Sequence, residues 1–147
     1  MPVLERELWV PRAREEVFAF FADAGNLQKI TPAWLHFQIV HAAGPIPMQA
    51  GTLIDYRLRV HGIPLRWTSE ITVWEPPLRF VDEQRRGPYR EWRHEHRFEA
   101  RNGNTLVRDR VEYQVLGGRL IDRLFVRPDL ARIFKYREQI LREILRR

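Results

Sequence analysis

At 147 residues the chain has the length of one ordinary domain, and its 44% hydrophobic and 30% charged residues indicate a soluble globular protein. No apolar stretch is long enough to span a membrane, and the absence of cysteine excludes disulfides, thiolate nucleophiles and cysteine metal sites. The formal net charge is +6, but arginines alternate with glutamates along most of the chain, so we expect no nucleic-acid partner.

The predicted elements begin with a strand over residues 3–10, where apolar and charged residues alternate loosely. A helix is predicted after Pro11, and a second short helix ends near Ile30, before Thr31-Pro32. Strands are then predicted at 35–42, 52–60, 64–75, 78–85, 90–100 and 105–115. Short turns such as His61-Gly62 and Asn102-Gly103-Asn104 separate these strands, which favours antiparallel neighbours.

Beyond Gly117-Gly118 the apolar period changes to that of a helix. Apolar residues spaced by three and four predict a long helix over 129–146, with a kink or break at Pro128 before it. The order of elements predicts an α+β helix-grip fold within one domain, residues 1–147. In this fold a curved antiparallel sheet of about six or seven strands wraps around the C-terminal helix, and two short helices follow the first strand.

The segment 91–99 alternates without a break between charged residues and a second set, Trp92, His94, His96 and Phe98. Successive side chains of a strand point to opposite faces, so one face is exposed and the other carries two histidines between two aromatic rings. A buried polar group without a partner costs about 1–3 kcal/mol, so this pattern is unusual for a purely structural core. It indicates a pocket with a polar interior.

Extending this face to the neighbouring strands gives the residues expected to point inward. In strand 78–85 we place Phe80, Asp82 and Gln84 on the inner face, which sets Asp82 beside or diagonal to His94. The residues predicted to contact a ligand are Tyr56, Trp67, Ser69, Phe80, Asp82, Gln84, Trp92, His94, His96, Phe98, Asp109 and Tyr113. An aromatic wall with a few convergent polar groups is typical of a small-molecule site.

Four interpretations of the polar groups stay open. They can lie at the sheet rim or satisfy one another in a compact core. His94 and His96 can bind a metal with Asp82 or Asp109 as third ligand, although we expect neither metal nor cofactor. His94 with Asp82, or His96 with Asp109, can form an acid–base pair, which makes these four the candidate catalytic residues. We favour the fourth interpretation, in which the polar groups orient the head of an apolar ligand.

The order of elements and several motifs also resemble a known family, the SRPBCC superfamily. This START-like, helix-grip group includes polyketide cyclases, lipid-transfer domains and coenzyme-Q-binding proteins, and the similarity is to a single-domain bacterial ligand-binding subgroup. The resemblance implies a cavity for hydrophobic ligands between the sheet and the C-terminal helix, but no defined set of catalytic residues. The motifs are Asn26-Leu27 leading to Ile30-Thr31-Pro32 and Trp34, Arg66-Trp67, Pro76 to Gln84, Gly87-Pro88-Tyr89, Trp92-x-His94-x-His96-x-Phe98, Asp109-Arg110-Val111-x-Tyr113 and Ile133-Phe134-x-Tyr136-Arg137.

The expected function is therefore binding of a lipid, isoprenoid, quinone or polyketide-like molecule, with a cyclase- or hydrolase-type enzyme as the alternative. The N-terminus is charged where a signal peptide would be apolar, so a cytoplasmic location is expected. A minor alternative is peripheral association with an anionic membrane or a partner protein. It is motivated by the arginines of the predicted C-terminal helix, which are Arg132, Arg137, Arg142, Arg146 and Arg147.

Overall fold

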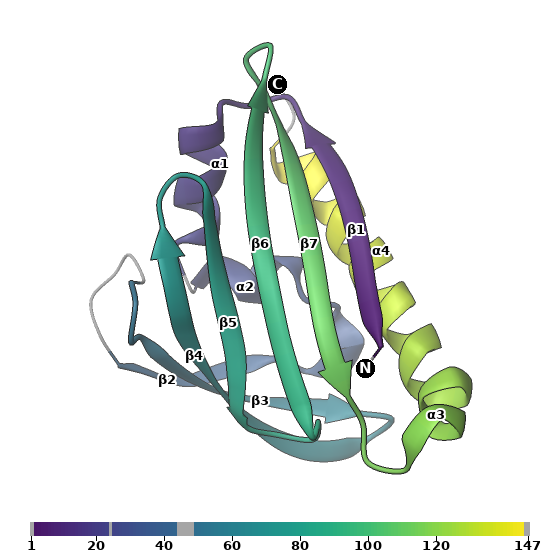
Figure 1. Ribbon diagram of the computed structural model, residues 1–147. Coiled ribbons are helices and arrows are strands. Elements are labelled where there is room, and N and C mark those ends of the chain that lie inside the picture. The colour runs from purple at the N-terminus through teal and green to yellow at the C-terminus, as the bar shows by residue number, and fades with distance from the viewer. Residues whose placement is uncertain (1, 24, 44–48, 146–147) are drawn as a thin grey trace.

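The fold is built on one antiparallel sheet of seven strands in the order β1-β7-β6-β5-β4-β3-β2. The computed structural model describes residues 2–23, 25–43 and 49–145. The first strand lies beside the last, so the sheet brings the two ends of the strand sequence together (Figure 1). The strands are β1 (Val3–Val10), β2 (Gln38–Ala43), β3 (Leu53–Val60), β4 (Ile63–Glu75), β5 (Arg79–Arg86), β6 (Glu91–Arg101) and β7 (Asn104–Gln114).

Two of the connections are two-residue hairpin turns, and their sequences favour the backbone conformation that they adopt. His61 and Gly62, between β3 and β4, have φ angles of 51° and 80°, and Asn102 and Gly103, between β6 and β7, have φ angles of 52° and 79°. Positive φ at both central residues defines the turn that matches the twist of antiparallel strands, and Asn-Gly is its preferred sequence. These turns fix the register of the central strands.

The inner face of β6 is the predicted one. His94, His96 and Phe98 are buried while Arg97 is exposed. The same alternation holds along most of β4, but the register of β4 against β5 shifts between Ile71 and Val73. Strict alternation from Ile71 would point Val73 inward, but Trp74 packs against the hydrophobic core instead, because a bulge offsets the alternation by one residue.

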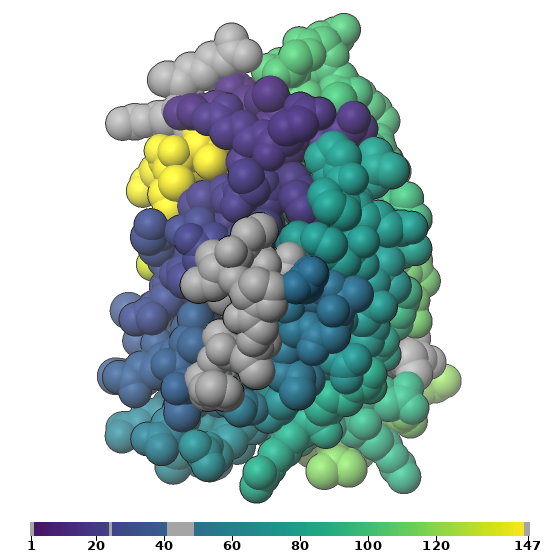
Figure 2. Space-filling view, turned by 90° about the vertical axis from the view of Figure 1, so that its left-hand side faces the viewer, coloured from purple at the N-terminus to yellow at the C-terminus, as the bar shows by residue number. Residues whose placement is uncertain are grey.

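All helices lie on one side of the sheet (Figure 1). The short helices are α1 (Arg14–Phe21), α2 (Gly25–Ile30) and a 3₁₀ turn, η1 (Ala33–Leu35), which occupies the start of the predicted strand 35–42. Figure 2 shows α1 and α2, in purple and blue, between the yellow C-terminal part of α4 and the teal strands. They close that side of the molecule.

Of the kink or break predicted at Pro128, the structure has no break: the C-terminal helix continues, with a local distortion just before the proline. Helix α3 (Gly118–Ile121) passes through a π-helical turn, η2 (Asp122–Val126), into α4 (Arg127–Ile144), and Pro128 lies in the first turn of α4. Proline removes one backbone donor and clashes with the preceding turn, and the widened π-helical turn just before it accommodates both effects. Arg146 and Arg147 lie outside the described residues.

The apolar core fills one end of the space between helices and sheet. Phe18 of α1 meets Phe80 and Phe98 of the sheet edge to face, with ring centroids 5.9 Å and 5.3 Å away. Leu141 belongs to the same cluster. Edge-to-face aromatic contacts stabilise a core beyond the effect of buried apolar area, so this end forms a closely packed, solid core. Within the described residues no helix has the length and hydropathy to cross a bilayer.

Candidate functional site

At the other end of that space, between the sheet and α4, lies a cavity of about 620 Å³. Its walls are mainly aromatic and aliphatic. Tyr56 and Trp67 stack at 5.9 Å, and Trp92 meets Trp67 edge to face at 5.2 Å. This volume is in the range of small-molecule sites, and the side of α4 facing it carries Leu130 and Phe134.

Eight of the twelve predicted ligand-contacting residues line this cavity. They are Tyr56, Trp67, Ser69, Phe80, Asp82, Trp92, His94 and His96. The other four are buried or half-buried nearby but not in its wall. Phe98 packs in the solid core, Gln84 bonds the backbone of Tyr89, and the hydroxyl of Tyr113 donates to Asp122 at 2.7 Å. Asp109 lies behind His94, whose Nε2 is 2.8 Å from its Oδ1.

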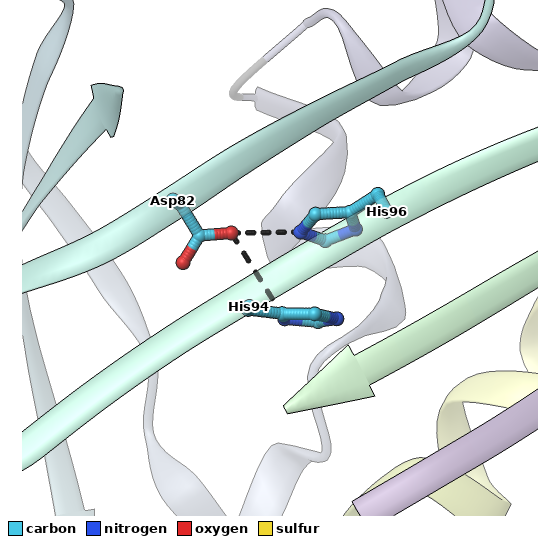
Figure 3. A group of neighbouring side chains, drawn as sticks. All are labelled: Asp82, His94 and His96. Carbon is cyan, nitrogen blue, oxygen red and sulfur yellow. Dashed lines mark hydrogen bonds and ion pairs between the residues drawn. The ribbon is translucent and has the colours of Figure 1, made fainter. Parts of the chain in front are cut away.

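Asp82 contacts both histidines, as Figure 3 shows: its Oδ2 is 2.7 Å from His96 Nε2 and 3.9 Å from His94 Nδ1. In the sheet register Asp82 lies opposite His94, as predicted, and Asp109 lies opposite His96. The hydrogen bonds join His94 to Asp109 and His96 to Asp82. The pairs proposed from the sequence are longer contacts, 3.9 Å from His94 Nδ1 to Asp82 Oδ2 and 3.5 Å from His96 Nδ1 to Asp109 Oδ1. The two imidazoles stack with centroids 3.7 Å apart, and each ring edge therefore reaches the diagonal carboxylate.

Both carboxylates of this cluster are ionised at neutral pH. Burial acts to raise the pKa of Asp82, but the hydrogen bond from His96 and nearby positive charge hold that pKa below its ordinary value. Burial opposes ionisation of Asp109 as well, and the Arg137 guanidinium together with the His94 hydrogen bond holds its pKa far below the usual range. The cluster therefore carries fixed negative charge beside an apolar cavity.

His96 is a neutral imidazole with a defined tautomer. Burial, with His94 as the next cause, lowers the pKa of His96 to about 4. An ionised carboxylate can only accept hydrogen bonds, so Nε2 of His96 carries the proton and donates to Asp82. In the neutral imidazole Nδ1 is then unprotonated and can act as an acceptor. That Nδ1 is buried and has no hydrogen-bond partner among the described residues, lying 3.5 Å from Asp109 Oδ1. This nitrogen therefore lies behind the cavity wall, on the side of Asp109.

The lowered pKa of His96 predicts a loss of stability in mild acid. An unfolded histidine binds a proton near pH 6.5, whereas folded His96 does so only near pH 4. Stability is thus fully present above about pH 6.5 and falls by up to about 3 kcal/mol toward pH 4. Denaturant unfolding at several pH values should show this slope in the wild type and a flatter one in His96→Gln. Equal slopes in both proteins would contradict the assignment.

Arg137 is a site residue that the sequence analysis missed. It was grouped with the exposed arginines of the C-terminal helix, yet its side chain is 11% exposed and lines the cavity. Its Nη2 lies 3.5 Å from Asp109 Oδ1, and its guanidinium sits over the rings of Phe21 and Phe134. Its position seven residues after Leu130 and four before Leu141 places it on the buried stripe, which the spacing could have revealed.

Three further polar groups lie on the β3–β4 side of the cavity. The Tyr56 hydroxyl and Ser69 Oγ are 3.1 Å apart, and burial raises the pKa of Tyr56 far above its usual value, so the phenol is neutral. The Trp67 Nε1–H is buried without a partner in the described part of the chain. This nitrogen has no accessible surface, so it lies behind the cavity wall, which the Trp67 ring itself helps to form.

A metal ion would have one set of residues to bind among those described. Asp82, His94 and His96 offer ligand atoms within 4.8 Å of one another. A histidine binds a metal through a lone pair in its ring plane, and stacked rings direct these lone pairs side by side instead of toward one point. The observed rotamers therefore suit hydrogen bonds to carboxylates better than shared coordination, and elemental analysis of the purified protein would test this.

The lining residues that are themselves exposed, among them Trp34, His61 and Leu116, indicate that the cavity opens near the β3–β4 turn and the start of α4. His61 Nε2 of the turn is 2.7 Å from Asp129 Oδ2, and both residues line the cavity. Beside this contact, Trp34 packs against Tyr136 and beneath the Arg132 guanidinium. Side chains from three separate segments thus surround the opening.

Several solved structures share this fold over nearly the whole chain. Protein CV1439 from Chromobacterium violaceum has a TM-score of 0.78 at 9% identity, with 100% of this chain and 99% of that chain covered. Protein TTHA0849 from Thermus thermophilus has a TM-score of 0.70 at 17% identity, covering 95% and 97%. A point mutant of norcoclaurine synthase from Thalictrum flavum, in complex with a transition-state analogue, has 0.69 at 13%, covering 97% and 94%.

At these identities the likeness concerns the fold alone. No curated protein matches the sequence significantly. The family model described as "Polyketide cyclase / dehydrase and lipid transport" matches residues 10–135, from the end of β1 to the first half of α4. The chain belongs to the polyketide cyclase / dehydrase and lipid transport family.

Proposed function

We propose that the protein binds a hydrophobic or amphipathic small molecule, such as a lipid, isoprenoid, quinone or polyketide-like compound, in the cavity beneath α4. The observation that carries this proposal is the cavity of about 620 Å³, whose mainly aromatic and aliphatic walls also carry a few polar residues, Ser69, Asp82, His94 and His96. A ligand that buries apolar surface there and bonds to these residues would gain from both effects.

The charges of the site favour a ligand with a neutral polar group. Asp82 and Asp109 are ionised, and Arg137 is the one guanidinium in contact with them among the described residues. A carboxylate or phosphate head would add negative charge where two carboxylates face one cation. A hydroxyl or carbonyl would meet no such cost, so we infer a phenol-, alcohol- or ketone-bearing ligand.

Native mass spectrometry of the purified protein, followed by solvent extraction, would test whether such a compound is carried. A matched pair of probes tests the charge preference. We expect 2-naphthol to bind at least about tenfold more tightly than 2-naphthoate, since one close charge contact accounts for roughly 1–2 kcal/mol. If neither probe binds and no compound is extracted, the proposal fails.

A second candidate function, acid–base catalysis, is favoured by one observation. His96 has its Nε2–H held by Asp82 while Nδ1 is unpartnered, which is how an oriented general base is arranged. A pKa of about 4, however, makes this imidazole a weak base at neutral pH. Ligand binding is therefore the better-supported function.

The double variant His94→Gln/His96→Gln separates the two candidates. Glutamine keeps hydrogen-bonding capacity, so 2-naphthol affinity should fall by about tenfold or less. Under the enzymatic alternative, the wild type would accelerate hydrolysis of a probe such as 2-naphthyl acetate. The double variant would then lose about two orders of magnitude in turnover while largely keeping its naphthol affinity. Calorimetry and absorbance assays on the same preparations measure both quantities.

A further inference from the structure

The segment 116–127, which leads into α4, exposes large apolar side chains close together. Leu116, Leu120, Leu124 and Phe125 are each more than half exposed, and Ile121 is 37% exposed. Single exposed apolar residues are ordinary, but a contiguous group of this size on a protein surface marks an interaction site. Among the described residues, no element covers this group in the way that α4 covers the sheet.

The same segment is positively charged on its exposed side. Arg119 and Arg123 are exposed and form no ion pair with the described residues. Arg127 pairs with Asp122, the segment's one acidic residue. Asp122 is 2% exposed and accepts the Tyr113 hydroxyl, so its carboxylate is withdrawn from the surface. What the segment presents to a partner is leucine, isoleucine, phenylalanine and arginine.

The position of the segment connects it with the cavity. Leu116 and Val126, near its two ends, line the cavity together with His61 and Gly62 of the β3–β4 turn. Ile63, the next residue after that turn, is 62% exposed. Figure 1 shows α3 at the end of the molecule opposite the C-terminus of α4. The apolar segment therefore borders the mouth of the cavity.

We propose that residues 116–127 dock the protein on an anionic lipid bilayer, with the cavity mouth facing the membrane. Apolar side chains flanked by arginines match the boundary between acyl chains and anionic head groups. A second copy of the chain fits less well, because a two-fold contact would bring unpaired arginines of both copies together. Two arginines further along α4 are not part of this surface, since Arg137 is buried and Arg132 pairs with Asp129. The proposal stands whether or not the cavity holds a ligand.

Vesicle co-sedimentation tests the docking directly. We expect the wild type to bind phosphatidylcholine vesicles containing about one-third phosphatidylglycerol at about 0.15 M salt, and pure phosphatidylcholine more weakly. Leu124→Ser/Phe125→Ser and Arg119→Gln/Arg123→Gln should each weaken partition by at least about tenfold. The matched controls are Leu78→Ser/Ile144→Ser and Arg97→Gln/Arg110→Gln, which change exposed residues outside the segment and should bind as the wild type does.

Two outcomes would overturn the proposal. The first is equal binding by the segment variants and their controls, or no binding to anionic vesicles. The second is self-association in sedimentation velocity that Leu124→Ser/Phe125→Ser abolishes, because this would assign the face to a second copy. Thermal unfolding of each variant confirms that it is folded, and 2-naphthol affinity reports separately on the cavity.

Discussion

Replacing Arg137 by Met is expected to lower the free energy of unfolding by about 3 kcal/mol at pH 7. The guanidinium is the cation nearest to Asp109, 3.5 Å from Oδ1, and both side chains are almost wholly buried. Methionine keeps most of the apolar contact with Phe21 and Phe134 but leaves two buried carboxylates without a fixed positive charge. Denaturant unfolding followed by circular dichroism measures the difference.

Arg132→Met is the matched control on the same helix. Arg132 is 61% exposed and pairs with Asp129, and exposed ion pairs contribute at most about 1 kcal/mol. The double variant Asp109→Asn/Arg137→Met removes one buried charge of each sign and should recover part of the lost stability. A cost for Arg137→Met no larger than that for Arg132→Met would show that Arg137 does not stabilise the buried carboxylates.

Filling the cavity should remove ligand binding without unfolding the protein. Ser69 is 4% exposed in the cavity wall, beside Tyr56 and across from α4. Ser69→Phe places a phenyl ring in the space proposed for the ligand, and we expect 2-naphthol affinity to fall by about 100-fold, or about 3 kcal/mol. The lost hydrogen bond to Tyr56 costs only about 1 kcal/mol of stability. Calorimetric titration measures the affinity.

The neighbouring position provides the control. Glu70 lies on the opposite face of β4, where it pairs with Arg85, so Glu70→Phe adds a ring outside the cavity. It should bind 2-naphthol like the wild type. A folded Ser69→Phe protein that binds as tightly as Glu70→Phe would mean that the probe binds elsewhere.

The sequence predicted the sheet and its faces because alternation is a local property of a strand. The unbroken pattern from Trp92 to Phe98 placed His94 and His96 inside, and the Asn102-Gly103 turn fixed the adjacent hairpin. Alternation does not predict which residues of the inner face line the cavity and which pack in the core, because this depends on what covers each part of the strand. Phe98 shares a face with the histidines but belongs to the solid core, because α1 covers that end of the sheet.

Contacts that depend on side-chain rotamers and on packing between distant elements escaped prediction. The crossed pairing of His94 with Asp109 arises from ring stacking, which register alone does not specify. The role of Arg137 depends on the helix lying over Asp109, a contact between residues 28 positions apart, although its helical spacing gave a usable signal. Pro128 indicated a distortion correctly but not its form, because a π-helical turn upstream lets the helix continue.

The claim that the cavity holds the ligand is tested most directly by the tryptophan indole N–H signals in a ¹H–¹⁵N spectrum during titration with 2-naphthol. The chain has five tryptophans, of which Trp34, Trp67 and Trp92 line the cavity, whereas Trp9 is 52% exposed and does not line it. We predict that the signals of Trp67 and Trp92 shift to saturation and that Trp9 stays in place. The largest change is expected at Trp67, whose Nε1–H has no partner in the described part of the free protein. Unchanged Trp67 and Trp92 signals at saturating probe would contradict the account.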